Sequence, residues 1–159
     1  MSAAESLVPL PAPEGFRAVD LGPGFVTNNA QLYGRWADEK LTLGFRVEAR
    51  LANLAGSLHG GMLASFADTF LPYAVMYQSL GKRRIMPTIN LQIDYVAPAM
   101  MGSWVHGEAT VLRVTRTIAF VQGLAFADGE VIARASGIFK LGNHIEGGDG
   151  DFFGLKSVS

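Results

Sequence analysis

The 159-residue chain contains no cysteine, only three histidines and no long apolar run. Without thiols it can form neither a disulfide, nor a thiolate nucleophile, nor a sulfur-ligated zinc site. The histidines are widely separated, so we expect no metal and no other cofactor. No stretch approaches the roughly 18 to 20 apolar residues of a membrane span, and the first residues lack the basic start of a secretory signal. We therefore expect a soluble, cytoplasmic protein.

The chain also lacks a strong charge of either sign. Thirteen lysines and arginines stand against fourteen aspartates and glutamates. Such a balance creates no field that would gather nucleic acid or anionic membranes, so we expect neither as a partner. The partner that we expect is therefore a small molecule or another protein. Apolar residues make up 49% of the chain, which is enough for the core of one domain.

The composition divides the chain into three parts. Residues 1–28 hold four prolines and three glycines, which interrupt regular structure and predict a lead-in segment. Residues 29–141 carry the regular hydrophobic patterns and are predicted to form the domain. Residues 142–159 are rich in glycine, and we expect a loosely structured tail apart from an anchor at Phe152 and Phe153.

Hydrophobic periodicity predicts one long helix and six strands within the domain. From Gly60 to about Leu80, apolar residues recur at the spacing of a buried helix face. Strands are expected at 31–37, 40–47, 88–95, 104–114, 117–127 and 130–141. Two strands, the helix and then four strands with short connections indicate an α+β fold, in which an antiparallel sheet packs on one central helix.

The segment from Asn53 to His59-Gly60-Gly61, followed by Asp68 in the apolar helix, resembles the PaaI-type branch of hotdog-fold acyl-CoA thioesterases. This branch includes 4-hydroxybenzoyl-CoA thioesterases and human-type acyl-CoA hydrolases. The combination is specific because an asparagine six residues before the histidine and an aspartate nine after it accompany the expected order of elements. The resemblance covers roughly residues 32–141. It implies a hotdog fold, in which a long antiparallel sheet wraps around the central helix.

The resemblance implies hydrolysis of an acyl-CoA or aryl-CoA thioester, with coenzyme A as part of the substrate. It implies that Asp68 is the catalytic carboxylate, Gly60 the oxyanion-binding amide and Asn53 a polar group beside the thioester. Thr88 falls where relatives carry a hydroxyl that holds the attacking water. The family's active sites lie at the interface of a homodimer, often within a tetramer. A non-catalytic acyl-CoA-binding or sensing hotdog domain is the alternative.

The residue types suit this chemistry. The first amides of a helix have no intrahelical acceptor, and Gly60 and Gly61 lack a Cβ that would keep a thioester oxygen away. Asp68 is a carboxylate in an otherwise apolar helix, and such groups are enriched at functional sites because burying them is unfavourable. As a base it would activate water, and as a nucleophile it would form a mixed anhydride. The sequence is compatible with both roles.

The spacing along the helix predicts that Gly60 and Asp68 either meet across a subunit interface, as in the family's dimeric site, or do not meet at all. Asp68 lies eight residues beyond Gly60, which separates them by about 12 Å at ~1.5 Å per residue. One subunit therefore cannot bring both to one carbonyl, and the same distance excludes a dyad of Asp68 with His59. For His59, a structural role at the start of the helix and a catalytic role both remain open. Asn53 fits an Asx-turn as well as a substrate contact.

Pro72 departs from the family pattern. It lies four residues after Asp68, where some relatives carry a threonine at the water site, and it should kink the helix. Thr88, Thr69 or Ser65 must then supply any hydroxyl. The period of two in 88–95, however, places Thr88 on the polar face of its strand.

Substrate-binding residues are expected after the helix start. Arg84 and Arg116 are candidates for the phosphates of coenzyme A, although exposed surface charge explains them equally. Tyr73 is a candidate for the acyl channel, although core packing explains it as well.

Overall fold

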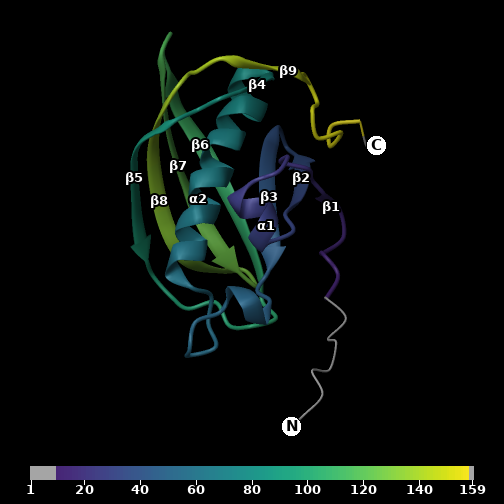
Figure 1. Ribbon diagram of the computed structural model, residues 1–159, viewed down its shortest axis with the longest axis vertical. Helices are drawn as coiled ribbons and strands as arrows, with labels where there is room; N and C mark the ends of the chain where they lie inside the picture. Colours follow the sequence, from purple (N-terminus) through teal and green to yellow (C-terminus); the bar gives the residue numbers. More distant parts are fainter. Residues whose placement is uncertain (1–9, 158–159) are drawn as a thin grey trace.

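The computed structural model describes residues 10–157 (Figure 1). The first nine residues of the predicted lead-in and the last two of the predicted tail lie outside this range. The strands are β1 Arg17–Ala18, β2 Tyr33–Ala37, β3 Lys40–Arg46, β4 Lys82–Arg84, β5 Thr88–Tyr95, β6 Trp104–Val114, β7 Ile118–Ala127, β8 Glu130–Lys140 and β9 His144–Asp149. The helices are α1 Phe25–Asn29, the 3-10 turn η1 Ala49–Leu51, α2 Gly60–Val75 and the π-helical turn η2 Met76–Leu80.

Seven strands form one antiparallel sheet in the order β1-β2-β3-β6-β7-β8-β5, and α2 lies across one face of it (Figure 1). Two-residue turns join β2 to β3 and β7 to β8. In the second, Asp128 and Gly129 both have positive φ, at 47° and 88°, as hairpin turns of this length require. The predicted antiparallel sheet around one central helix is confirmed.

Close packing of α2 on the sheet determines which side of the helix is exposed. Phe66, Phe70 and Leu71 are buried against the sheet, and glycines opposite them make room. A Cβ at Gly107 would lie 2.5 Å from the Phe70 ring, and one at Gly123 would lie 2.8 Å from it. With this face buried, Asp68 is left on the exposed flank of α2.

The end of α2 differs in detail from the sequence prediction. The α-helix runs to Val75 with Pro72 inside it, and a π-helical turn then ends at Gly81, whose φ is 62°. Pro72 has no N–H to donate to the Asp68 carbonyl. It does not end the helix, because the Met76 N–H still bonds the carbonyls of Pro72 and Tyr73.

A β-bulge in the edge strand β5 changes the expected direction of one side chain. The register with β8 shifts between Thr88 and Asn90, so that Thr88 lies opposite the buried Phe139. Directly paired residues share a face of the sheet, so Thr88 faces α2, as Leu91 does after the bulge. The strict alternation that placed Thr88 on the opposite face is therefore wrong at this residue.

The C-terminal segment is ordered, which corrects the expectation of a loose tail. β9 pairs with β4, and Gly148 permits this pairing because a Cβ there would lie 2.4 Å from that of Arg83. Beyond β9, the rings of Phe152 and Phe153 pack on Tyr77 at centroid distances of 4.8 and 5.6 Å. The predicted anchor at Phe152 and Phe153 is thus confirmed, and the segment covers the end of α2.

Asp151 holds this segment in place and makes its stability depend on pH. Burial alone would raise the pKa of Asp151, but hydrogen bonds from the Tyr77 hydroxyl and the amides of Leu155, Lys156 and Ser157 more than offset it and lower the pKa. The carboxylate therefore stabilises the fold fully above its unfolded pKa of about 3.9. This contribution is lost as the pH falls through the lower folded pKa.

We expect Asp151→Asn to lower the free energy of unfolding by about 1–3 kcal/mol near neutral pH, because donors lose a charged acceptor. Denaturant titrations of parent and variant at about pH 7 and about pH 3 measure the difference, which should shrink at the lower pH. An equal difference at both pH values would contradict a role for the charge.

Candidate functional site

The Asp68 carboxylate accepts a hydrogen bond from the Thr88 hydroxyl, with 2.6 Å between Oδ1 and Oγ1. The other two candidate hydroxyls bond the backbone: Ser65 donates to the Gly61 carbonyl at 2.9 Å, and Thr69 donates to the Ser65 carbonyl at 2.8 Å. Of the three, Thr88 is the one that contacts Asp68. Because its proton is used, the Thr88 oxygen can accept a hydrogen bond from water, as can the second oxygen of Asp68.

His59 caps the start of α2. Its Nδ1 accepts a hydrogen bond from the Gly61 N–H at 2.9 Å, so an imidazole that makes this cap carries no proton on Nδ1. A Cβ at Gly61 would lie 2.9 Å from the His59 ring, which explains the glycine. The cap occupies the Gly61 amide. Among the hydrogen bonds of residues 10–157, none uses the Gly60 N–H, which leaves this amide as the available donor.

A cavity of about 390 Å³ opens beside this amide. Leu58, Leu63 and Ile132 contribute to its apolar wall, and Asn53 and Gly60 also line it. The cavity can therefore place an apolar group next to a free N–H.

Asn53 lies at the cavity in the conformation of an Asx-turn. Its Oδ1 accepts hydrogen bonds from the amides of Ala55 at 2.9 Å and Ser57 at 3.2 Å. Its Nδ2 donates to the Ser57 hydroxyl at 3.1 Å. The turn that the sequence suggested is present, and the second N–H of the side-chain amide can still serve a ligand.

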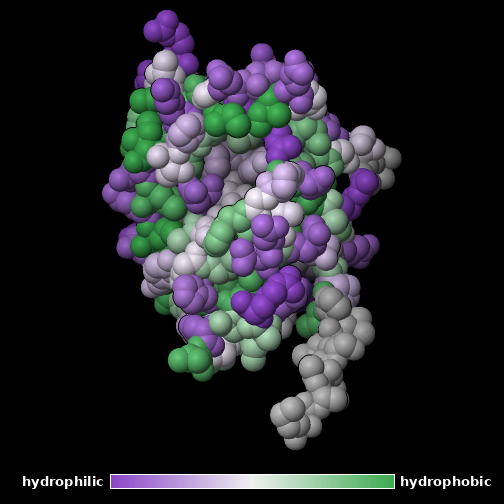
Figure 2. Space-filling view, in the orientation of Figure 1, coloured by the Kyte–Doolittle hydropathy of each residue, from purple (hydrophilic) through white to green (hydrophobic). Residues whose placement is uncertain are grey.

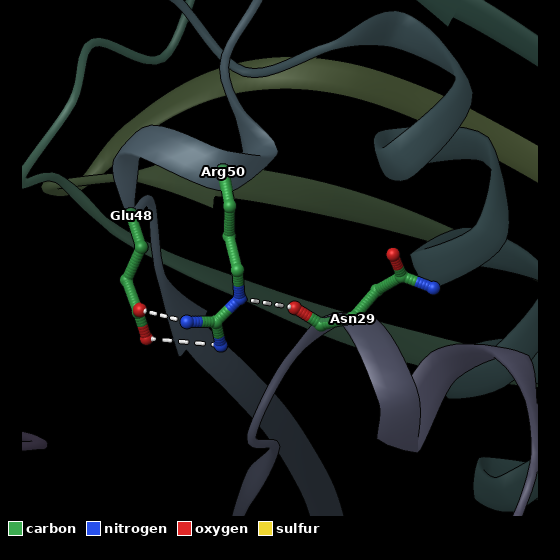
Figure 3. Close-up of polar contacts among 3 residues, drawn as sticks. All are labelled: Asn29, Glu48 and Arg50. Atoms are coloured by element: carbon green, nitrogen blue, oxygen red, sulfur yellow. Dashed lines mark hydrogen bonds and ion pairs between the residues drawn. The ribbon is translucent and has the colours of Figure 1, made fainter.

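An ion pair supports the loop that leads to Asn53 (Figure 3). Arg50 pairs with Glu48, and its Nε donates to the Asn29 carbonyl at 2.8 Å. An exposed pair of this kind contributes only about 0–1 kcal/mol. Its effect is local, since it joins η1 to the end of α1.

Asp68 and the Gly60 N–H lie near opposite ends of β5. The strand begins with Thr88, which bonds Asp68, and ends with Tyr95, whose hydroxyl donates to the Gly60 carbonyl at 2.7 Å. Because α2 is continuous from Gly60 to Val75, the eight-residue spacing separates the two by about 12 Å. Within one chain the two groups therefore lie apart. We call these two positions, the Asp68–Thr88 pair and the Gly60 amide, the half-sites of the candidate site.

The two arginines predicted to bind coenzyme A lie at one end of the sheet. Arg84, on β4, donates from Nε to the Gly142 carbonyl at 2.7 Å. Arg116 is exposed in the turn between β6 and β7. The Leu141 amide bonds the Thr117 carbonyl at 2.8 Å, which brings the two segments together. Guanidinium groups in such positions can meet phosphates.

Tyr73 lies beneath the C-terminal segment and not at the cavity. Its hydroxyl accepts a hydrogen bond from Arg83 at 2.8 Å, and its ring stacks on Phe153 at 5.3 Å. Thr69 is buried in α2 and also lies outside the residues that line the cavity. Sequence reasoning missed Tyr95, the last residue of β5, because its contact with Gly60 joins segments that are 35 residues apart.

The part of the chain that the structure describes contains no helix long and apolar enough to cross a membrane. Within residues 10–157, no three side chains of the types that ligate metals come close enough together to hold an ion.

The chain is similar to known thioesterases. A family model described as the thioesterase superfamily matches residues 55–133. Mouse acyl-coenzyme A thioesterase 13 is 31% identical over 109 residues, which are 67% of this chain and 76% of the mouse protein. Zebrafish thioesterase superfamily member 2, whose crystal structure is known, is 29% identical in sequence to this chain. The two structures match with a TM-score of 0.65 over 77% of this chain and 89% of the zebrafish chain.

A protein from Streptococcus pneumoniae that is described as a hypothetical thioesterase, solved with coenzyme A, shares the fold at 17% identity, with a TM-score of 0.62 over 71% of this chain and 87% of its own. These similarities confirm the predicted hotdog fold and the resemblance to acyl-CoA thioesterases. The chain belongs to the thioesterase superfamily and is a thioester hydrolase.

Proposed function

We propose that this protein hydrolyses an acyl-CoA or aryl-CoA thioester to the free acid and coenzyme A, in a site that two subunits build. One observation carries the proposal. A carboxylate held by a hydroxyl lies at one end of β5, and an unbonded helix amide beside an apolar cavity lies at the other. These are the two functions that hydrolysis of a thioester requires.

The Gly60 N–H serves as the oxyanion donor. As the thioester carbonyl is attacked, negative charge develops on its oxygen, and a fixed amide at a helix N-terminus stabilises that charge. The amide is free, and the glycine leaves space for the oxygen to approach. Asn53 provides a second donor at the cavity.

Asp68 acts on the carbonyl carbon, either through water or directly. A water that donates one hydrogen to the free Asp68 oxygen and the other to Thr88 keeps a lone pair for attack. As a base, Asp68 takes a proton from the water while the water oxygen bonds the carbonyl carbon and the oxyanion forms. The C=O bond then re-forms, the carbon–sulfur bond breaks and the coenzyme A thiolate leaves. As a nucleophile, its oxygen bonds the carbonyl carbon and displaces the coenzyme A thiolate, which leaves a mixed anhydride that water then hydrolyses to the free acid and Asp68.

The free edge of β5 supports the two-subunit site. β5 is the last strand of the sheet and pairs only with β8 among the described strands. Along the left margin of Figure 2, over β5, hydrophobic residues are interspersed with hydrophilic ones, and Ile89 and Tyr95 are each 55% exposed. A long edge strand with unpaired backbone groups and exposed apolar side chains favours pairing with another strand.

Antiparallel pairing of two β5 strands places the start of one beside the end of the other. Thr88 and Asp68 of one copy then lie next to Tyr95 and Gly60 of the second copy. A homodimer completes two equivalent sites, and two such dimers would form a tetramer.

Coenzyme A as the leaving group is supported by the relative from Streptococcus pneumoniae, which was solved with this molecule. Arg84 and Arg116 bind its phosphates at the end of the sheet nearest Thr88, while the cavity beside Gly60 takes the acyl or aryl group. None of these steps uses a further cofactor.

The test is release of free thiol from a panel of short-, medium- and long-chain acyl-CoAs together with aryl-CoAs. We expect turnover of at least one thioester, with activity retained after treatment with EDTA. If the protein binds acyl-CoA but hydrolyses none of the panel, the alternative of a non-catalytic binding domain is supported instead.

A further inference from the structure

We infer that Tyr95 is a positioning residue that directs the Gly60 N–H at the thioester oxygen. The inference depends on the proposed role of Gly60 as oxyanion donor. Tyr95 is 55% exposed, so core packing does not account for it, and the partner of its hydroxyl is the first carbonyl of α2.

The peptide group that carries the Gly60 N–H is held at its other end. Its carbonyl belongs to His59 and accepts hydrogen bonds from the amides of Met62 and Leu63, at 3.0 and 3.1 Å. This contact fixes one of the two peptide planes that flank Gly60. Because a glycine has the freest backbone torsions of any residue, holding the second plane as well limits how far the backbone at Gly60, and with it the N–H, can move.

The second plane joins Gly60 to Gly61. Its carbonyl is the first of α2 and accepts the helical bond from the Ala64 amide, and two side chains hold the plane in addition. His59 Nδ1 accepts from its N–H at 2.9 Å, and the Tyr95 hydroxyl donates to its carbonyl at 2.7 Å. The His59 contact comes from the neighbouring residue of the same turn. Tyr95, in contrast, belongs to β5 and so joins the helix start to the sheet.

The Tyr95 ring also packs next to Gly60 at the wall of the cavity. A Cβ at Gly60 would lie 3.5 Å from the ring, which is ordinary van der Waals contact. Ring and hydroxyl together determine the distance between the end of β5 and the free amide. Since Thr88, at the start of the same strand, bonds Asp68, β5 positions both half-sites.

Tyr95→Phe tests the inference because it retains the ring and removes only the hydroxyl. We expect kcat to fall about three- to tenfold, the effect of one hydrogen bond, with KM within about twofold of the parent. The loss should be the same on an acyl-CoA and on the acyl N-acetylcysteamine thioester, which lacks the nucleotide, because the defect lies at the carbonyl. Tyr33→Phe is the matched control and should leave activity unchanged. Tyr33 belongs to β2 and packs near Trp104 of β6, away from the cavity.

A second measurement does not depend on turnover. In amide proton–nitrogen NMR spectra, Tyr95→Phe should shift the Gly60 and Gly61 resonances and speed hydrogen exchange of the Gly61 N–H, whereas Tyr33→Phe should not. Unchanged resonances, or parental kcat on both substrates, would overturn the role of Tyr95. If the parent turns over no thioester, the proposed function fails on its own, and the spectra still decide whether Tyr95 holds this amide.

Discussion

Asp68→Asn is expected to lower kcat/KM by about 10³-fold, within the range measured for loss of a general base or nucleophile. Asparagine has the same shape as aspartate, and its oxygen can still accept the hydrogen bond from Thr88. It cannot take a proton from water or attack a carbonyl. Because Asp68 lies on the exposed flank of α2, the variant should keep the parental melting temperature.

Glu146→Gln is the matched control for this change. It removes one exposed carboxylate from β9, away from both half-sites, and alters the net charge equally. Thiol release and thermal unfolding of the three proteins give the comparison. If Asp68→Asn keeps more than about a tenth of the parental kcat/KM, the loss is too small for a catalytic carboxylate, and the proposed role of Asp68 is contradicted.

Gly60→Pro is expected to lower kcat/KM by about 10²-fold or more, as found when an oxyanion donor is removed. Proline lacks an N–H but suits the first position of a helix, where that N–H has no intrahelical acceptor. The preceding residue, His59, has φ −60° and ψ 131°, the extended conformation that proline prefers before it. Gly60 has no positive φ that proline would oppose.

Gly60→Ala separates loss of the amide from addition of atoms. Alanine keeps the N–H, and its Cβ meets the Tyr95 ring at an ordinary 3.5 Å. We therefore expect a much smaller loss than with proline, while both variants remain folded by thermal unfolding. Equal activity of the proline and alanine variants would show that this amide does not stabilise the transition state.

The sequence predicted most of the regular elements, because burial against one core imposes a local period on each. Strands expected at 88–95 and 104–114 have those bounds, and the one expected at 130–141 ends one residue earlier. The bulge at Thr88 was not predictable in this way, since it depends on the register with β8. β9 was also missed, because glycines that suggest a loose tail here permit two strands to approach closely.

The candidate site was predictable where its residues are neighbours along the helix. The spacing of Gly60 and Asp68 alone indicated that the two groups lie apart within one subunit. That estimate assumed an uninterrupted helix between them, and α2 is continuous from Gly60 to Val75. The family resemblance named Gly60 as the oxyanion-binding amide, whereas the residue types alone suited Gly60 and Gly61 alike. The His59 cap on the Gly61 amide distinguishes the two. Contacts between distant segments, such as Tyr95 with Gly60 or Tyr73 with the C-terminal rings, left no periodic signal.

The two-subunit site is tested most directly by mixing the Asp68→Asn and Gly60→Pro variants, each nearly inactive alone. In a dimer with one subunit of each kind, Asp68 of one subunit meets Gly60 of the other, so one of its two sites is intact. Random mixing makes half of the dimers mixed, and activity should return to about a quarter of the parental value. If mixed dimers verified by mass spectrometry are no more active than the separate variants, the site is not shared between subunits.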